Sequence, residues 1–225
     1  MPTHEAGALH AEGGHHGPSW LRPPEDVNAL VPALWAHSVR RGQAGALTVG
    51  GLDVRELAGE FGTPAYVIDE DDFRSRAREF KQSFNDAFQD LCGGADVYYA
   101  GKAFLCTAVA RWIHEEGLHL DVCSGGELAV AIRAGFPADL IGFHGNNKSL
   151  TEIDAALRHG VGRTVVDSFE EIDRVASAAE RLGVVAPVMV RVTVGVEAHT
   201  HEYIATAHED QKFGFSLAGG QAAEA

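Results

Sequence analysis

The stretch VYYAGKAF, residues 97–104, places a single lysine, Lys102, between an apolar strand pattern and a helical pattern. In a barrel of alternating strands and helices, the chemistry is carried by residues at the carboxyl ends of the strands. A lysine held there, with its stem packed and its amine facing a pocket, can form a Schiff base. A solvated lysine at a helix start is the alternative that this stretch alone leaves open.

Apolar strand-like segments recur after this lysine at a nearly constant interval. They centre near Tyr98, Leu120, Ile141, Val165 and Met189, in steps of 21 to 24 residues. Each is followed by apolar residues at i, i+3 and i+4, the spacing of a helix with one buried side, and the first such pattern begins at residue 104. The chain therefore alternates strands and helices.

The residues at the predicted helix ends support the same interpretation. A glycine follows each helix, where a left-handed residue closes the last turn, and three serines precede a glutamate at capping-box spacing. Strand–helix units of this length favour a parallel sheet with right-handed crossovers. We predict an α/β fold of the (β/α)8 TIM-barrel type, because the spacing is regular and no glycine-rich dinucleotide loop occurs. The glycines are Gly117, Gly135, Gly160 and Gly183, and the serines are Ser124, Ser149 and Ser168.

The predicted barrel is incomplete. A full barrel needs roughly 250 residues, whereas the repeats here begin only near Asp96 and supply about five strands. We expect residues 71–225 to form this incomplete barrel and the chain to be a truncated, N-terminal part of a longer protein. Open strand edges would make such a part prone to aggregation and catalytically silent on its own.

The N-terminal third differs in composition. Residues 1–24 are rich in Gly, His and Pro without periodicity, which predicts a disordered leader. Residues 25–70 are predicted to belong partly to a second, β domain, with weak helical patterns at 27–34 and 52–61. A short strand is predicted over residues 63–68. The amphipathic pattern of residues 73–91 predicts a helix that leads into the first barrel strand.

Composition limits the partners. The net charge is −14, from 32 acidic and 18 basic residues, which disfavours nucleic acids and anionic membrane surfaces. No apolar run is long enough to span a membrane. The three cysteines, Cys92, Cys106 and Cys123, are odd in number and scattered, which is typical of reduced thiols in a cytoplasmic protein.

Polar residues follow every predicted strand. Because the carboxyl ends of parallel strands meet at one edge, we expect these side chains to line one site. Ser124 and Glu127 are explained equally well as a helix cap, Asp167 as a turn residue and Lys148 as a solvated lysine. We expect no metal site, since no helical spacing pairs His144 with His199 or His201. The candidates are Lys102, Asp121, Ser124, Glu127, His144, Asn146, Asn147, Lys148, Asp167, Ser168, Arg191, Glu197, His199 and His201.

Six segments together resemble the diaminopimelate decarboxylases, pyridoxal-phosphate enzymes with an alanine-racemase-like barrel. They are FGTPAYVIDE, YYAGKAF, LDVCSGGELAVAIRAGF, FHGNNKS, VVDSFEEIDRV and AHTHEYIATAHEDQKFG, and the resemblance runs from about Val49 to the last residue. HGNNKS together with SGGEL resembles the bacterial diaminopimelate enzymes more than the ornithine or arginine decarboxylases.

The resemblance implies specific roles. Lys102 would hold pyridoxal 5′-phosphate covalently, with Asp121, His144 and Arg191 beside the cofactor and with Glu127 and Ser124 as further pocket residues. The motif at residues 212–214 matches the loop before a sixth strand unit. The implied reaction is decarboxylation of meso-2,6-diaminopimelate to L-lysine, the last step of lysine biosynthesis, by a homodimer of the full-length protein. The family's ring-stacking histidine and glycine-rich phosphate cradle come later in the sequence than Ala225.

Three other functions stay open. One is a non-catalytic pyridoxal-phosphate barrel of the same fold, against which the HGNNKS motif and residues 63–68 argue. Another is a decarboxylase for a different basic amino acid. The third is a barrel that binds a phosphorylated metabolite without a covalent bond, and an absorbance spectrum with added pyridoxal phosphate distinguishes it from the others.

Overall fold

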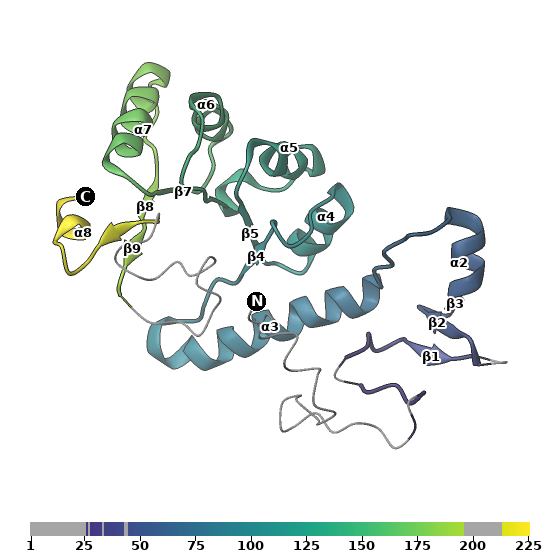
Figure 1. Cartoon of the computed structure of the whole chain (residues 1–225). Coiled ribbons are helices and arrows are strands. Elements are labelled where there is room, and N and C mark those ends of the chain that lie inside the picture. The colour runs from purple at the N-terminus through teal and green to yellow at the C-terminus, as the bar shows by residue number, and fades with distance from the viewer. Residues whose placement is uncertain (1–25, 27, 33, 43–44, 196–212) are drawn as a thin grey trace, which may run out of the picture. The chain divides into compact units, whose positions relative to one another are not determined.

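The computed structural model describes residues 26, 28–32, 34–42, 45–195 and 213–225 (Figure 1). The expected leader, residues 1–24, lies outside the described residues. The chain divides into two compact units, Met1–Phe73 and Arg74–Ala225. The first unit contains a three-stranded sheet, and the second contains a five-stranded and a two-stranded sheet.

The first unit contains a small antiparallel sheet and one helix. Strands β1 (Arg40–Arg41), β2 (Leu47–Val49) and β3 (Leu52–Asp53) pair in that order, and α2 spans Val54–Phe61. Gly50 and Gly51 connect β2 to β3 with φ angles of 59° and 83°, as a two-residue hairpin turn requires. Helix α2 begins two residues after the predicted start, at Val54, where the Asp53 side chain caps it by accepting a hydrogen bond from the Arg55 N–H.

Two predictions for this unit are wrong. Residues 63–68 form no strand, and the Tyr66 side chain is fully exposed. An apolar extended segment becomes a strand only when another strand pairs with it, and no described strand does so here. The described residues within 27–34 form turns instead of a helix, with Leu34 N–H donating to Val31 O over 2.9 Å.

The second unit is a parallel sheet whose strands follow one another in sequence order. Helix α3 (Glu70–Cys92) leads into it. The strands are β4 (Tyr98–Ala100), β5 (His119–Val122), β6 (Ile141–Phe143), β7 (Arg163–Val166) and β8 (Val188–Val190). The helices are α4 (Thr107–Glu115), α5 (Gly125–Ala134), α6 (Leu150–His159) and α7 (Phe169–Leu182), with a 3-10 turn at Ala138–Leu140. All five predicted strand centres fall within or beside these strands, which confirms the predicted alternation.

Beyond the five-stranded sheet, the second unit has a separate two-stranded sheet. Strand β9 (Val192–Thr193) follows β8 after Arg191 and pairs in parallel with β10 (Phe215–Ser216). A short helix, α8 (Gln221–Glu224), comes next. The described residues thus form a partial barrel with a sixth strand, at the position where the sequence resemblance implied one.

The two faces of the parallel sheet differ. Leu120 and Val122 of β5 and Ile141 and Phe143 of β6 are fully buried, and helices α4 to α7 line the convex side of the sheet (Figure 1). Burial of each such side chain contributes roughly 1.5–3 kcal/mol. Asp121 alternates with these residues and therefore lies on the concave face.

The helix ends use the predicted residues. Ser149 and Glu152 form a complete capping box at α6, whereas Ser124 and Ser168 each accept one backbone hydrogen bond at α5 and α7. The C-terminal glycines of α5, α6 and α7 have φ between 67° and 78°. The N-terminal caps set the direction in which the chain passes from a strand into its helix, and the glycines set the direction in which it leaves that helix.

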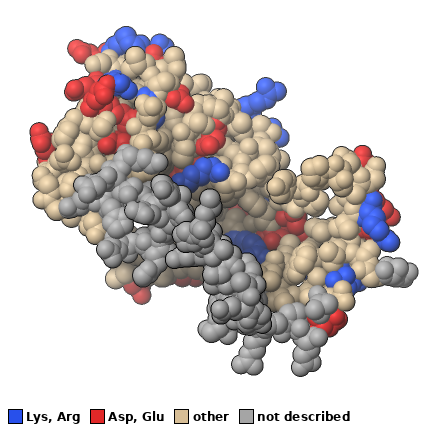
Figure 2. Space-filling model, viewed as in Figure 1, with Lys and Arg blue, Asp and Glu red and all other residues tan. Residues whose placement is uncertain are grey.

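The outer helices carry charged residues of both signs. Arg174 pairs with Glu170 on α7, and Arg181 pairs with Asp154 of α6. Figure 2 shows such side chains gathered over α7, at the top of the view. Within the part of the chain that the structure describes, no helix has the length and apolar character needed to cross a membrane.

Gly162 gives a test of the packing before β7. Its N–H donates to Ala138 O over 2.9 Å, and a Cβ at this position would overlap the Asp139 carbonyl oxygen. We expect Gly162→Ala to lower the free energy of unfolding by about 1–3 kcal/mol, measured by urea unfolding. Gly126→Ala is the control, because its Cβ would meet nothing closer than 3.8 Å. Equal stabilities of the two variants would contradict the packing described.

Candidate active site

Lys102 lies in a turn at the carboxyl end of β4 and is exposed. The turn is fixed to the next strand, because the Gly101 N–H donates to Asp121 O over 2.8 Å. A Cβ at residue 101 would come within 2.7 Å of that oxygen, so the position requires glycine. Helix α4 begins at Thr107, later than the predicted Phe104, and the Tyr99 hydroxyl donates to Phe104 O over 2.8 Å. Residues 104–106 precede the helix, with Cys106 at its N-cap position.

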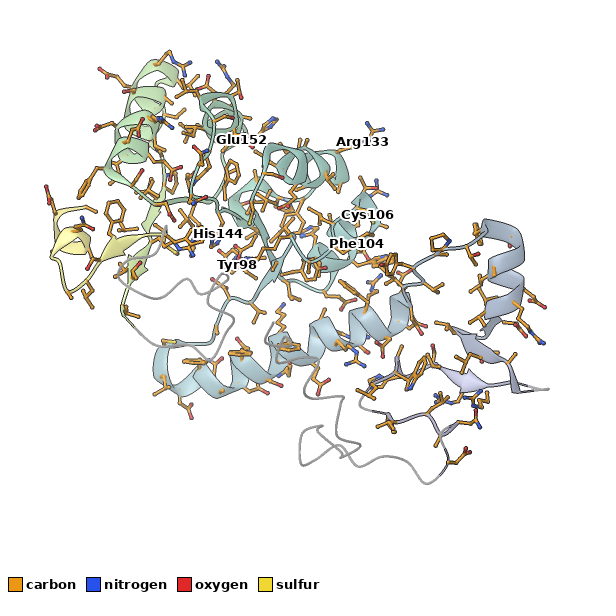
Figure 3. All side chains as sticks on the ribbon, in the orientation of Figure 1. Tyr98, Phe104, Cys106, Arg133, His144 and Glu152 are labelled. Carbon is orange, nitrogen blue, oxygen red and sulfur yellow. The ribbon has the colours of Figure 1, made fainter. Side chains whose placement is uncertain are left out.

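Asp121 and His144 meet on the concave face. Asp121 Oδ1 lies 3.2 Å from His144 Nε2, and both side chains are partly exposed. Gly142 stands beside them, and a Cβ there would be 2.6 Å from Asp121 Oδ1. Tyr98 lies on the same side of the sheet as His144 (Figure 3), and burial raises the pKa of its hydroxyl. The missing side chain at Gly142 leaves the carboxylate room to reach the imidazole.

Ser124 and Glu127 hold the turn between β5 and α5. The Glu127 N–H donates to Ser124 Oγ over 3.2 Å, and the Cys123 N–H donates to Glu127 Oε2 over 2.7 Å. Burial raises the pKa of the Cys123 thiol, and the neighbouring Glu127 carboxylate adds to this effect. In the structure both residues act as helix-capping groups, the alternative that the sequence left open.

Arg191 follows β8 and is held by two neighbours. Its Nη1 lies 3.4 Å from Asp167 Oδ1, and its guanidinium lies over the Phe213 ring, 4.2 Å from the ring centre. Asp167 is buried, so its interpretation as an ordinary turn residue is wrong. Its second oxygen, Oδ2, accepts the Gly214 N–H over 3.1 Å.

Lys148 is also placed differently from its expected solvated position. It is 3% exposed, and its Nζ donates to Gly145 O, Val165 O and both oxygens of Glu171 over 2.6 to 3.0 Å. Glu171 is equally buried. The sequence shows a lysine in a polar loop, and its carboxylate partner comes from the start of α7, 23 residues later.

Among the described residues, those predicted at the ends of the strands lie at one edge of the sheet. Lys102, His144, Asp167 and Arg191 follow the carboxyl ends of β4, β6, β7 and β8, and Asp121 lies near the end of β5. Within this group, direct contacts join Asp121 to His144 and Asp167 to Arg191. Glu197, His199, His201 and Lys212 lie outside the described residues. No cluster of three or more metal-binding side chains occurs in the described ranges.

Sequence reasoning missed the buried pair Lys148–Glu171 and the role of Phe213. Glu171 has the spacing of a capping glutamate, and the Ser168 Oγ does accept the Glu171 N–H. Its side chain, however, receives the Asp167 N–H and the Lys148 ammonium. The spacing of Ser168 and Glu171 identifies the helix cap, but it does not indicate that Lys148 pairs with Glu171.

Comparison with known proteins places the chain in a family. Residues 70–225 match the family described as "Pyridoxal-dependent decarboxylase, pyridoxal binding domain". The diaminopimelate decarboxylase of Mycobacterium leprae is 53% identical over 224 residues, which cover 99% of this chain and 46% of the relative. That of Bacillus subtilis is 50% identical over 182 residues, covering 81% and 40%. The chain thus spans less than half the length of these relatives.

Solved structures of diaminopimelate decarboxylases are also similar to this chain. The diaminopimelate decarboxylase of M. jannaschii in complex with L-lysine matches with a TM-score of 0.74 and 30% identity. The match covers 84% of this chain and 43% of that one. The partial barrel, its lysine-bearing edge and the extended match therefore lead to one conclusion: this chain belongs to the pyridoxal-dependent decarboxylases.

Proposed function

We propose that the chain supplies the cofactor-binding barrel of a diaminopimelate decarboxylase and that Lys102 binds pyridoxal phosphate covalently. The observation that carries the proposal is the position of Lys102, exposed at the carboxyl edge of β4 in a domain of the pyridoxal-binding family. The substrate class, a diamino acid that yields L-lysine, follows from the names of the relatives and from the L-lysine complex of the M. jannaschii protein.

The residues at this edge fit such a cofactor. Its aldehyde needs an accessible amine, and the exposed Lys102 provides one. Its anionic groups need donors, and the guanidinium of Arg191 and the imidazole of His144 are partly exposed near the ends of their strands. Gly101 and Gly142 keep the backbone beside Asp121 free of side chains. These features support pyridoxal phosphate at this edge.

Asp121 has a distinct part in this scheme. Its carboxylate oxygen Oδ1 lies 3.2 Å from His144 Nε2, so a hydrogen on that nitrogen can be donated to the carboxylate. This contact orients the His144 imidazole through Nε2 and leaves Nδ1 as the second polar atom of the ring. Bound pyridoxal phosphate supplies the electron sink for decarboxylation. The residues of this chain would bind and orient the cofactor.

The remaining features of the scheme are also proposals. We assign residues 25–70 partly to a β domain and 71–225 to the barrel, supported by the antiparallel sheet and by the division after Phe73. We also propose a cytoplasmic location and a homodimer of the full-length protein. The three free cysteines support a reducing compartment. Sedimentation analysis of a full-length protein tests the dimer.

Borohydride trapping tests the covalent site. The 225-residue chain is incubated with pyridoxal phosphate, reduced with borohydride and mapped by peptide mass spectrometry. We expect one pyridoxyl group, on Lys102, because this lysine is exposed at the active edge while Lys148 uses its donors in buried hydrogen bonds. A pyridoxyl group found only on another lysine would refute the proposal.

The reaction is tested separately with a hybrid in which this chain is joined to the C-terminal part of the M. leprae relative. We expect L-lysine to be released from meso-diaminopimelate, with L-ornithine and L-arginine as control substrates. Faster turnover of either control substrate would refute the proposed substrate and indicate that the reaction acts on another basic amino acid.

A further inference from the structure

Asp167 is a buried carboxylate whose role lies outside the covalent chemistry. It follows β7 directly, and its side chain is only 3% exposed. A carboxylate that is removed from water without partners carries a large free-energy cost. The partners of its two oxygens therefore indicate the role of this buried charge.

Each oxygen of Asp167 is bonded to a different strand end. Oδ1 lies 3.4 Å from Nη1 of Arg191, which separates β8 from β9. Oδ2 accepts the backbone N–H of Gly214 over 3.1 Å, directly before β10. One carboxylate thus joins three neighbouring strands at the edge where the cofactor is proposed to bind.

The Arg191 guanidinium is restrained from a second side. It lies 4.2 Å from the centre of the Phe213 ring, within the range of a cation–π contact. Asp167 engages one of its two terminal nitrogens, and the side chain stays 29% exposed. A guanidinium has five N–H donors in a planar fork, so an anchored Arg191 keeps donors directed elsewhere. The contacts with Asp167 and Phe213 fix the direction of these remaining donors.

The backbone of Asp167 is also held by a hydrogen bond. Its N–H donates to Glu171 Oε2 over 3.0 Å, and both oxygens of Glu171 lie 3.0 Å from Lys148 Nζ. Lys148 and Glu171 are each 3% exposed. The backbone that carries Asp167 is therefore tied to a buried ion pair, which limits how far its carboxylate can move.

We propose that Asp167 is a positioning residue that orients the Arg191 guanidinium toward an anionic group of the bound cofactor. Asp167 acts through Arg191 and does not itself touch the ligand. This inference rests on the proposed function. It predicts that the effects of removing Asp167 and Arg191 on cofactor affinity are not additive, because both substitutions remove the same oriented guanidinium.

A double-mutant cycle tests this prediction in the full 225-residue chain. Asp167→Asn, Arg191→Met and the double variant are titrated with pyridoxal phosphate, and the dissociation constant is read from the absorbance. We expect each single substitution to weaken binding about tenfold and the double variant to bind as weakly as Arg191→Met alone. If Asp167→Asn weakens binding equally in both backgrounds, or not at all, the proposal is overturned.

Asp154→Asn is the matched control, because Asp154 also pairs with an arginine, Arg181, but on the outer helices. We expect it to leave the dissociation constant unchanged. Thermal melts of all variants detect general destabilisation, which would weaken binding in both backgrounds of the cycle.

Two readouts need no cofactor and keep the inference separate from the proposed function. Asp167→Ala should speed hydrogen exchange of the Gly214 amide and shift the Arg191 side-chain N–H resonance, while Asp154→Asn does neither. Unchanged Gly214 and Arg191 signals would overturn the positioning role. Failure of the wild-type chain to bind pyridoxal phosphate, with these signals changed as expected, would instead refute the proposed function and the cofactor-directed role of Asp167 with it.

Discussion

Lys102→Ala should abolish the pyridoxyl group that borohydride fixes on the chain, together with the visible absorbance of lysine-bound pyridoxal phosphate. In the hybrid with the C-terminal part of the M. leprae relative, release of L-lysine should fall by several orders of magnitude. The reason is chemical: an amine at this position is the only proposed covalent attachment point, and alanine offers none. Absorbance, peptide mapping and a lysine-release assay measure the three effects.

Lys81→Ala is the matched control for this substitution. Lys81 is also exposed, but it lies on α3 with its Nζ beside Gly117, which precedes the amino end of β5, and not at a carboxyl strand end. We expect this variant to keep the pyridoxyl group on Lys102 and the turnover of the hybrid. Full labelling at Lys148 or Lys212 in the Lys102→Ala variant would transfer the covalent role to that lysine.

Lys148→Met should destabilise the chain more than any surface substitution. The ammonium of Lys148 is the partner of the buried Glu171 carboxylate, so its removal leaves a charge without compensation in the interior. Breaking a buried pair in this way costs about 3–5 kcal/mol. Urea unfolding followed by circular dichroism measures the loss, and for a chain of this length the melting temperature should fall by roughly 10 °C.

Arg174→Met provides the comparison. It breaks the exposed pair with Glu170 on α7, and exposed pairs contribute at most about 1 kcal/mol. The double variant Lys148→Met/Glu171→Met should regain part of the lost stability, since replacing both charges removes the uncompensated one. A Lys148→Met variant as stable as Arg174→Met would show that the pair is not the buried anchor described here.

The edge that carries the candidate site could be predicted because its determinants are local. Each strand and the helix after it are encoded within a repeat of 21 to 24 residues, and a parallel arrangement brings the residue after every strand to the same edge. Lys102, Asp121, His144 and Arg191 were therefore placed together without knowledge of any contact. The capping serines and closing glycines were likewise readable, since each helix cap depends on a few neighbouring residues.

Errors arose where a partner comes from far along the chain. Residues 63–68 have a strand-like pattern, but a strand exists only through pairing, and none of the described strands pairs with them. Lys148 stands in a polar loop, a pattern that leaves a solvated lysine open, although Glu171, 23 residues away, meets it in the interior. The sequence order of polar residues carries no information about such distant neighbours.

The sequence alone determined the alternation of strands and helices and the edge at which polar side chains gather, and it predicts Lys102 as the lysine for covalent chemistry. Periodicity and capping are short-range properties, so they can be read from neighbouring residues. Only the tertiary structure decided that Asp121 contacts His144 and that Asp167 holds both Arg191 and Gly214. These contacts join residues up to 47 positions apart, and they depend on strand register and on burial, which are set when the strands pair and the helices pack on them.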